Sequence, residues 1–240
     1  MSSKKEENRI LIRINSFGAF IKTEDIPEIL NKEIARPDLE FVRSILAGFF
    51  DLPIDALSQN ILERYVEVTT EKTHTQVAPS EDRLFERLTK PLSSAKKNYC
   101  LGEYAAAIAL SGTVAEMLIL LLWEINEIRI KGELISSQQE KALFGKKFDD
   151  LVHFRRVEIL KTFGIITEEQ YKLFDWIRKK RNDYLHSWSV DVSNEKKDAA
   201  KCVRNIFQLF LEITQIGISD AGTIKINPKL LKFFKEVEEA

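Results

Sequence analysis

The segment from Ala105 to Trp123 constrains the fold more than any other part of the sequence, because it is almost entirely apolar. It approaches the length of about 20 residues that a membrane-spanning helix needs. Glu116 lies near its middle, and an acid at that depth costs on the order of 3 kcal/mol during membrane insertion. We therefore expect the central helix of a bundle, buried by neighbouring helices, rather than a membrane span.

Residues that interrupt regular structure are scarce, with 9 glycines and 6 prolines among 240 residues. This scarcity favours long helices over a β architecture with many turns. Apolar residues make up 44% of the chain, which is enough to bury a core. The prediction is an all-α fold, and the length fits one large domain or two small ones.

A polar segment without periodicity, residues 69–79, is the best candidate for a linker. It lies at the end of an N-terminal region of unknown role, residues 1–75, which we expect to be mostly helical. The main helical domain is expected at residues 80–220 and a further helix within residues 221–240. The chain would thus divide into three parts, of which the second contains the apolar segment.

Local signals predict the individual elements. Alternating isoleucines at positions 10, 12 and 14 predict a short strand or hairpin within residues 9–22. Helices are expected where apolar residues recur at helical spacing or follow a capping sequence, as with Thr167 and Gln170. The expected helices cover residues 39–50, 54–68, 82–99, 104–130, 136–145, 148–163, 167–186, 193–216 and 228–239.

Basic and acidic residues almost balance, and the formal net charge is -1. No general field draws the chain to nucleic acid or to an anionic membrane, so RNA would need a local basic cluster. Cys100 and Cys202 have neither zinc-site spacing nor the pattern of a disulfide framework, which indicates free thiols in a reducing compartment. The charged N-terminus lacks a following apolar segment, and we expect a cytoplasmic protein with no membrane partner.

The strongest chemical signal is a run at the end of the helix expected over residues 167–186. Histidine exchanges protons near neutral pH, and arginine offers a permanently charged fork that matches phosphate. RNA supplies its own nucleophile, the 2′-hydroxyl, so these two side chains could cleave it without a metal or cofactor. The run consists of Arg178, Lys179, Lys180, Arg181, Asn182, Asp183, Tyr184, Leu185, His186, Ser187 and Trp188.

Each residue of this run has an expected role. Arg181 would bind the phosphate and His186 would act as acid or base, with Asn182 and Asp183 orienting them. On an ideal helix Asn182 and His186 lie about 40° apart, whereas Arg181 and His186 lie about 140° apart. Arg181 and His186 could meet at one phosphate only if the long arginine side chain bent around the helix, if the helix end were distorted, or if a second copy of the chain supplied one of them. The cations Arg178, Lys179 and Lys180 would supply the local positive field.

Structural interpretations stand beside these functional ones. Basic residues near a helix C-terminus oppose its dipole favourably, and a terminal histidine is often only a cap. Glu116 is either a buried acid paired with a cation such as Arg181, or the polar edge of its helix. His153 could touch phosphate, but a solvated charged face is favoured there. Trp188 is either a core residue or a surface on which a base stacks.

The run from Arg181 to His186 is similar to the motif of the HEPN superfamily, an arginine, a polar residue and then a histidine. The likeness covers roughly residues 80–220 and is closest to the DUF4145-like branch. It includes the segment from Tyr99 to Ala107, which resembles the entry to the family's long helices, and Glu116, where related sequences also tend to carry an acid.

The resemblance implies a bundle of four to five helices that pairs as a homodimer, with the two motifs facing across a cleft. It implies metal-independent RNA cleavage that leaves a cyclic phosphate and a 5′-hydroxyl. Many such proteins act as toxins or in antiphage defence, which would add an antitoxin or defence protein as partner. The alternative is a catalytically inactive module that binds RNA, nucleotide or protein. Trp188 stands where some toxin members carry a modifiable tyrosine, which puts that form of control in doubt.

Overall fold

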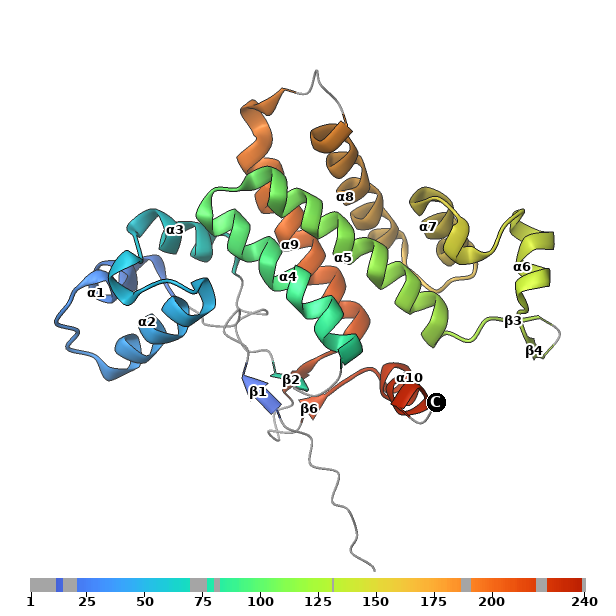
Figure 1. Ribbon diagram of the computed structural model, residues 1–240, viewed down its shortest axis with the longest axis horizontal. Coiled ribbons are helices and arrows are strands. Elements are labelled where there is room, and N and C mark those ends of the chain that lie inside the picture. Colours follow the sequence, from blue (N-terminus) through green and yellow to red (C-terminus); the bar gives the residue numbers. More distant parts are fainter. Residues whose placement is uncertain are drawn as a thin grey trace, which may run out of the picture.

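The structure is a computed structural model that describes residues 12–14, 21–69, 77–79, 83–130, 132–186, 191–218 and 224–238. Helices dominate these residues, and the strands form only short antiparallel pairs (Figure 1). The predicted all-α fold is therefore confirmed. The α-helices are α1 (Ile26–Leu30), α2 (Pro37–Phe50), α3 (Gln59–Val68), α4 (Arg83–Leu101), α5 (Tyr104–Ile125), α6 (Ser137–Phe144), α7 (His153–Thr162), α8 (Glu168–His186), α9 (Glu195–Thr214) and α10 (Pro228–Glu238).

Shorter elements connect these helices. Three pairs of strands are antiparallel: β1 with β2, β3 with β4, and β5 with β6. The strands are β1 (Ile12–Ile14), β2 (Val77–Pro79), β3 (Arg129–Ile130), β4 (Glu133–Leu134), β5 (Gly217–Ile218) and β6 (Ile224–Lys225). The 3-10 helices are η2 (Thr23–Asp25), η3 (Ile54–Ala56), η5 (Phe148–Asp150) and η6 (Val192–Asn194).

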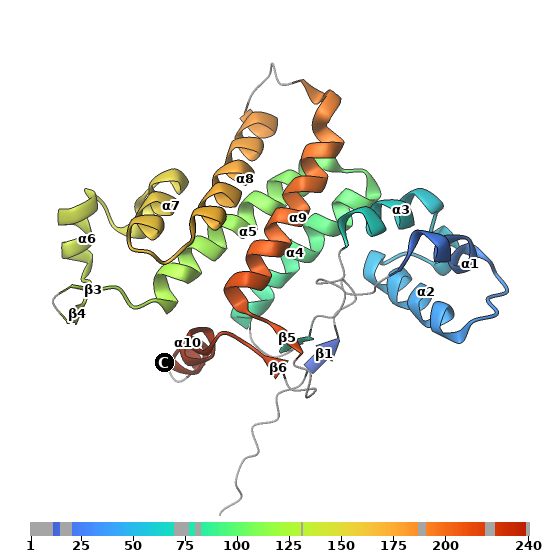
Figure 2. The ribbon, with the colours of Figure 1, turned by 180° about the vertical axis from the view of Figure 1, so that it is seen from behind.

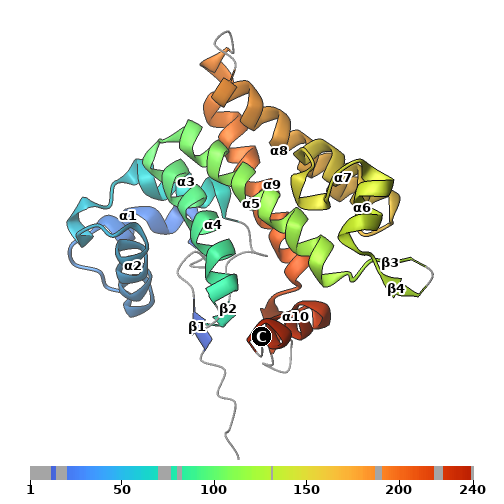
Figure 3. The ribbon, with the colours of Figure 1, turned by 45° about the vertical axis from the view of Figure 1, so that its right-hand side comes forward.

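The long helices α4, α5, α8 and α9 form a bundle around α5, which contacts each of the other three. Seen from behind, α9 lies in front of α4 and α5 and beside α8 (Figure 2). The shorter α7 packs on both α5 and α8 (Figure 3), and α6 precedes it in the chain. The predicted bundle is present, and α7 covers one part of it beside α5 and α8.

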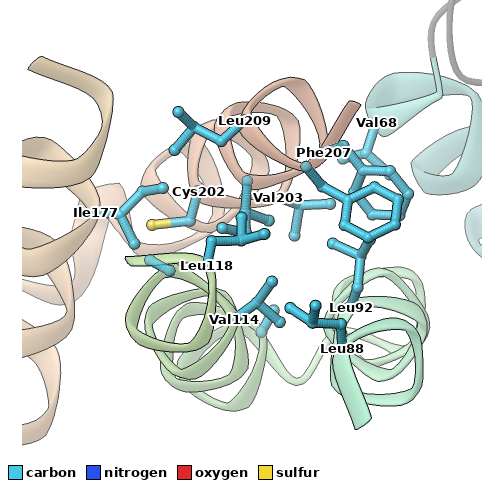
Figure 4. Close-up of a cluster of buried hydrophobic side chains, with 14 of the residues drawn as sticks. Val68, Leu88, Leu92, Val114, Leu118, Ile177, Cys202, Val203, Phe207 and Leu209 are labelled. Atoms are coloured by element: carbon cyan, nitrogen blue, oxygen red, sulfur yellow. The ribbon is translucent and has the colours of Figure 1, made fainter. Parts of the chain in front are cut away.

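Apolar side chains from several helices meet inside the bundle (Figure 4). Burial of a large aliphatic or aromatic side chain stabilises a fold by roughly 1.5–3 kcal/mol, so this cluster fixes the relative positions of its helices. The labelled members are Val68 from α3, Leu88 and Leu92 from α4, Val114 and Leu118 from α5, Ile177 from α8, and Cys202, Val203, Phe207 and Leu209 from α9.

Helix α5 is the apolar helix that the sequence placed at the centre. By length and composition it is able to cross a membrane, with a mean hydropathy of 2.1 in its most apolar window and half of that window buried. Such a composition is also that of the core helix of a bundle. Its neighbours α4, α7, α8, α9 and α10 surround much of it, in agreement with the expected central position.

The N-terminal helices α1 to α3 pack against the bundle chiefly through α3, which contacts α4 and α9. Lys96 of α4 is buried at this junction, with its ammonium 3.9 Å from the ring centroid of Tyr65 and 5.7 Å from that of Phe207. Burial lowers the pKa of Lys96 to about 7, because the charged form is separated from water. The junction between the N-terminal helices and the bundle thus contains a titratable group.

Three predicted helices end or begin elsewhere than expected. The helix expected over residues 54–68 is divided into η3 and α3, and α3 begins only at Gln59. The helix expected over residues 104–130 stops at Ile125, and β3 and β4 form a hairpin beyond it. The helix expected over residues 148–163 is divided, because Phe148 is held by contacts distant in sequence. Its ring stacks on Trp123 with centroids 4.0 Å apart, and its amide donates to Glu140 Oε2 over 2.9 Å. An uninterrupted helix therefore begins only at His153.

The strand predicted around the alternating isoleucines is present as β1, but its partner lies in the expected linker. Ile12 pairs with Pro79 and Ile14 with Val77, so the end of that segment is ordered by pairing. The linker prediction is wrong for residues 77–79, and residues 70–76 lie outside the described residues. Sequence periodicity could not reveal this pairing because its two strands are far apart in the chain.

Candidate functional site

Helix α8 supplies the platform for the motif. Its start is fixed by the predicted capping box, in which Thr167 Oγ1 accepts from the Gln170 amide over 3.2 Å and Gln170 Oε1 accepts from the Thr167 amide over 3.1 Å. Phe174 and Ile177 are buried, and α8 packs on α5, α7 and α9. The first part of α8 is therefore well packed, and it fixes the position of the last two turns, which contain the motif.

Arg181 lies against α5. Its Nη1 donates to Glu116 Oε1 over 2.6 Å, with about a third or less of each side chain exposed. A Cβ atom added at Gly112 would lie 2.4 Å from Arg181 Cδ, so the glycine leaves the space through which the arginine stem passes. The expected pairing of Glu116 with Arg181 is confirmed, at a half-buried position rather than deep in the core.

His153, the first residue of α7, reaches the same acid. Its Nδ1 lies 3.7 Å from Glu116 Oε1, a distance longer than a hydrogen bond but short enough for electrostatic contact. The His153 imidazole, together with the charges of Arg181 and Arg156, lowers the pKa of Glu116 against the opposing effect of burial. Glu116 is thus ionised at neutral pH, and one carboxylate oxygen faces both an arginine and a histidine.

These side chains form one side of an open pocket of about 440 Å³ between α5, α7 and α8. Three guanidinium groups border it against one carboxylate, so its charge favours an anion. The lining residues are Glu116, Leu151, Val152, His153, Phe154, Arg156, Arg178, Arg181 and Asn182. We call this the Arg181 pocket.

The other three cations of the run each pair with an acid. Arg178 donates through Nη2 to Asp175 Oδ1 over 2.7 Å, and Lys179 Nζ lies 2.7 Å from Asp175 Oδ2. Lys180 Nζ lies 2.7 Å from Asp198 Oδ2. Only Arg178 of these three borders the pocket. The local field expected from all three is consequently reduced by the two acids, which the run itself did not reveal.

His186 is exposed at the end of α8 and does not line the Arg181 pocket. Helix α8 is α-helical through His186, so a distorted end does not bring it to Arg181. Asn182, one turn earlier, is exposed and does line the pocket, whereas Asp183 is half-buried and does not. The structure therefore brings Arg181 and Asn182 together, but within one chain it leaves the imidazole outside.

Three neighbouring residues of the run remain. Tyr184 is half-buried, and its hydroxyl donates to Asp198 Oδ2 over 3.0 Å. Leu185 is 42% exposed and does not face the core. Trp188 lies outside the described residues.

His153 is the site residue that sequence reasoning underrated. A solvated charged face was favoured there, but only 9% of its side chain is exposed. Its Nε2 atom is buried and has no hydrogen-bond partner among the described residues. The expected solvated face is wrong because His153 begins α7 and its side chain lies against Glu116 of α5.

Metal and thiol chemistry find no support among the described residues. Their histidine, cysteine, aspartate and glutamate side chains form no group of three or more that could hold a metal ion. Burial raises the pKa of both Cys100 and Cys202 to about 12, so neither thiol is ionised at neutral pH. The arrangement offers instead a cationic pocket and, near it, an exposed imidazole.

Comparisons with protein-family models, curated proteins and solved structures gave no significant match to this chain.

Proposed function

We propose that this chain is a metal-independent endoribonuclease that acts as a homodimer. The observation that carries the proposal is the arrangement on α8: an arginine anchored by Glu116 in a cationic pocket, and an exposed histidine just beyond it. The similarity of Arg181 to His186 to the HEPN motif supports the same assignment. The two groups have the chemistry that cleavage of RNA requires.

In the proposed reaction the 2′-oxygen of a ribose attacks the adjacent phosphorus. A bond forms between O2′ and phosphorus, and the bond from phosphorus to O5′ of the next nucleotide breaks. His186 accepts the proton of the 2′-hydroxyl or returns one to the leaving O5′. Arg181 stabilises the charge that develops on the phosphate oxygens. The products are a 2′,3′-cyclic phosphate and a 5′-hydroxyl, and neither water nor metal enters the step.

The position of His186 supports a homodimer. Arg181 and His186 project from α8 about 140° apart, and the helix remains regular between them. A second copy related by a twofold axis would bring its own exposed His186 to the Arg181 pocket. Composite sites of this kind are compatible with the symmetric dimers that most homo-oligomers form.

Cleavage of a labelled single-stranded RNA in the presence of EDTA tests the proposal. We expect the wild-type chain to produce cyclic phosphate ends, and Arg181→Ala and His186→Ala each to reduce the rate by at least about 100-fold. Lys172→Ala, which removes an exposed cation from the same helix, is the matched control and should retain activity. Equal cleavage by all four proteins, or none by the wild type, would exclude the proposed reaction.

A second candidate is a phosphate-binding module without catalysis. It is favoured by one observation, namely that Arg181 shares its pocket with His153, whose Nε2 is buried, and not with the exposed His186. This candidate predicts RNA binding that depends on Arg181 but not on His186, with no cleavage. The same assay, combined with a binding measurement, separates the two functions.

A further inference from the structure

Phe154 is an unusual component of the Arg181 pocket. It is the second residue of α7, and although it is a large aromatic residue it is 37% exposed. The pocket is otherwise bordered mainly by charged and amide side chains. An exposed aromatic ring beside cations is a surface on which a nucleic-acid base can stack.

The ring of Phe154 is held beside a second flat group. The guanidinium carbon of Arg178 lies 5.3 Å from the ring centroid. Arg178 is itself fixed, because its Nε and Nη2 both donate to Asp175 Oδ1, over 3.1 and 2.7 Å. The aromatic ring and the guanidinium thus form a preorganised pair, and ordering them on binding would cost little conformational entropy.

The pocket also holds the groups that a nucleotide needs besides stacking. Arg181 can bind phosphate with the donors that Glu116 leaves available. Asn182 is exposed at the same pocket, and its amide carries both a donor and an acceptor for the edge of a base. Three neighbouring side chains could therefore bind the three parts of a nucleotide: Arg181 its phosphate, Phe154 the face of its base and Asn182 the edge of its base.

We propose that the Arg181 pocket is a nucleotide subsite in which an unpaired base stacks on Phe154 while its phosphate contacts Arg181. The inference rests on the proposed function in that it takes the bound phosphate to belong to RNA. A base inside a duplex is already stacked and cannot lie on the ring. The substrate class is therefore single-stranded RNA, and the residue that selects an unpaired base, Phe154, lies on α7 outside the motif.

Binding of short 2′-O-methyl oligoribonucleotides tests the subsite, because the methyl group blocks the nucleophile and prevents cleavage. Two probes are compared by fluorescence anisotropy, one with bases and one abasic throughout. For the probe with bases, we expect Phe154→Ala to weaken binding by about tenfold or more. Phe154→Trp should retain binding, and Phe154→Leu, which keeps apolar volume, should resemble Phe154→Ala.

The abasic probe supplies the decisive comparison. Wild type and Phe154→Ala should bind it equally, since no base is present to stack. Phe41→Ala is the matched control, because Phe41 is 66% exposed on α2, away from the pocket. It should bind both probes as the wild type does. A duplex form of the probe with bases gives a further comparison. The wild type should bind the single-stranded form more tightly than the duplex, and Phe154→Ala should show a smaller difference between the two.

The outcomes distinguish the subsite from the nuclease. Equal binding of the probe with bases by wild type and Phe154→Ala overturns the subsite, even if the wild type cleaves RNA. Phe154-dependent binding without any cleavage in EDTA supports the subsite and removes the nuclease. Failure of the wild type to bind either probe overturns the subsite, and so does an equal loss of both probes in Phe154→Ala.

Discussion

At the scale of single residues, Glu116 is the group that organises the pocket. One of its oxygens lies 2.6 Å from Arg181 Nη1 and 3.7 Å from His153 Nδ1. An arginine without this anchor would be free to adopt several rotamers, and its position over a phosphate would be lost part of the time. In the proposed reaction the acid would therefore act through Arg181, as a positioning residue rather than a catalytic one.

Replacing Glu116 with glutamine tests this role. The amide keeps the shape but loses the charge, so we expect RNA cleavage to fall by about tenfold while binding of phosphate is less affected. The pair is partly exposed, and its contribution to stability should be about 1 kcal/mol or less. Cleavage rates at saturating RNA, measured with Glu124→Gln of the same helix as control, should show the loss only in Glu116→Gln.

The lowered pKa of Glu116 also predicts that the stability difference between the wild type and Glu116→Gln depends on pH. A depressed carboxyl pKa contributes stability above the unfolded-state value, about 4.3, and this stability is lost as the pH falls through the lower folded-state value. The wild type should therefore lose its advantage over Glu116→Gln below about pH 4. Urea unfolding at pH 3 and pH 7 would contradict this if the difference between the two proteins did not change.

Gly112 is predicted to matter through Arg181 alone. Alanine favours a helix by up to about 1 kcal/mol over glycine, but its Cβ would lie 2.4 Å from Arg181 Cδ and force the arginine to move. We expect Gly112→Ala to fold with stability close to that of the wild type and to lose most RNA cleavage. Thermal unfolding and the EDTA assay measure the two effects separately.

Gly48 of α2 provides the matched control for that substitution. A Cβ added there meets no atom within 4 Å, so Gly48→Ala should stabilise the protein by about 0.5–1 kcal/mol and leave activity unchanged. A Gly112→Ala protein as active as the wild type would show that the contact between Arg181 and α5 is not needed for function.

At the scale of elements, the junction of α3, α4 and α9 should respond to alkaline pH through Lys96. Its folded-state pKa of about 7 lies below the ordinary value of 10.5, so the unfolded chain binds more protons between these values. Stability therefore rises with pH across that window, by an amount on the order of a few kcal/mol. Lys96→Met should abolish this rise, because methionine has no proton to bind.

Denaturant unfolding at pH 7 and pH 9.5 measures this dependence. Lys90→Met removes an exposed lysine of the same helix and should keep the wild-type rise. A wild-type protein whose stability does not increase over that range would show that Lys96 keeps its charge among the aromatic rings. The cation–π contacts with Tyr65 and Phe207 would then outweigh burial.

The elements also show how far sequence reasoning reaches. Helical periodicity and capping sequences predicted α2, α6, α8, α9 and α10 closely, since both are local properties of the chain. Two features could not be predicted in this way: the division of the helix expected over residues 148–163, and the pairing of β1 with β2. Both depend on contacts with residues that are distant in the sequence. The motif could be predicted as a set of residue types, but the pocket could not. Its wall at α7 depends on where that helix begins.

At the scale of the whole molecule, α8 lies on one side of the bundle (Figure 1), and its last residue, His186, is exposed. The chain buries the stem of Arg181 but leaves His186 outside the pocket. In the proposed nuclease this separation would require the arginine of one copy and the histidine of another to form a working site. A protein that remained monomeric at working concentration would have only the binding half of the site.

Mixing two inactive variants measures that requirement directly. Arg181→Ala and His186→Ala proteins are unfolded together, refolded as a mixture and assayed for RNA cleavage in EDTA. If sites form between chains, half of the dimers are mixed and each contains one intact site, so activity should return to about a quarter of the wild-type value. No recovery from a mixture in which mixed dimers are shown to form would contradict the composite site and the nuclease built on it.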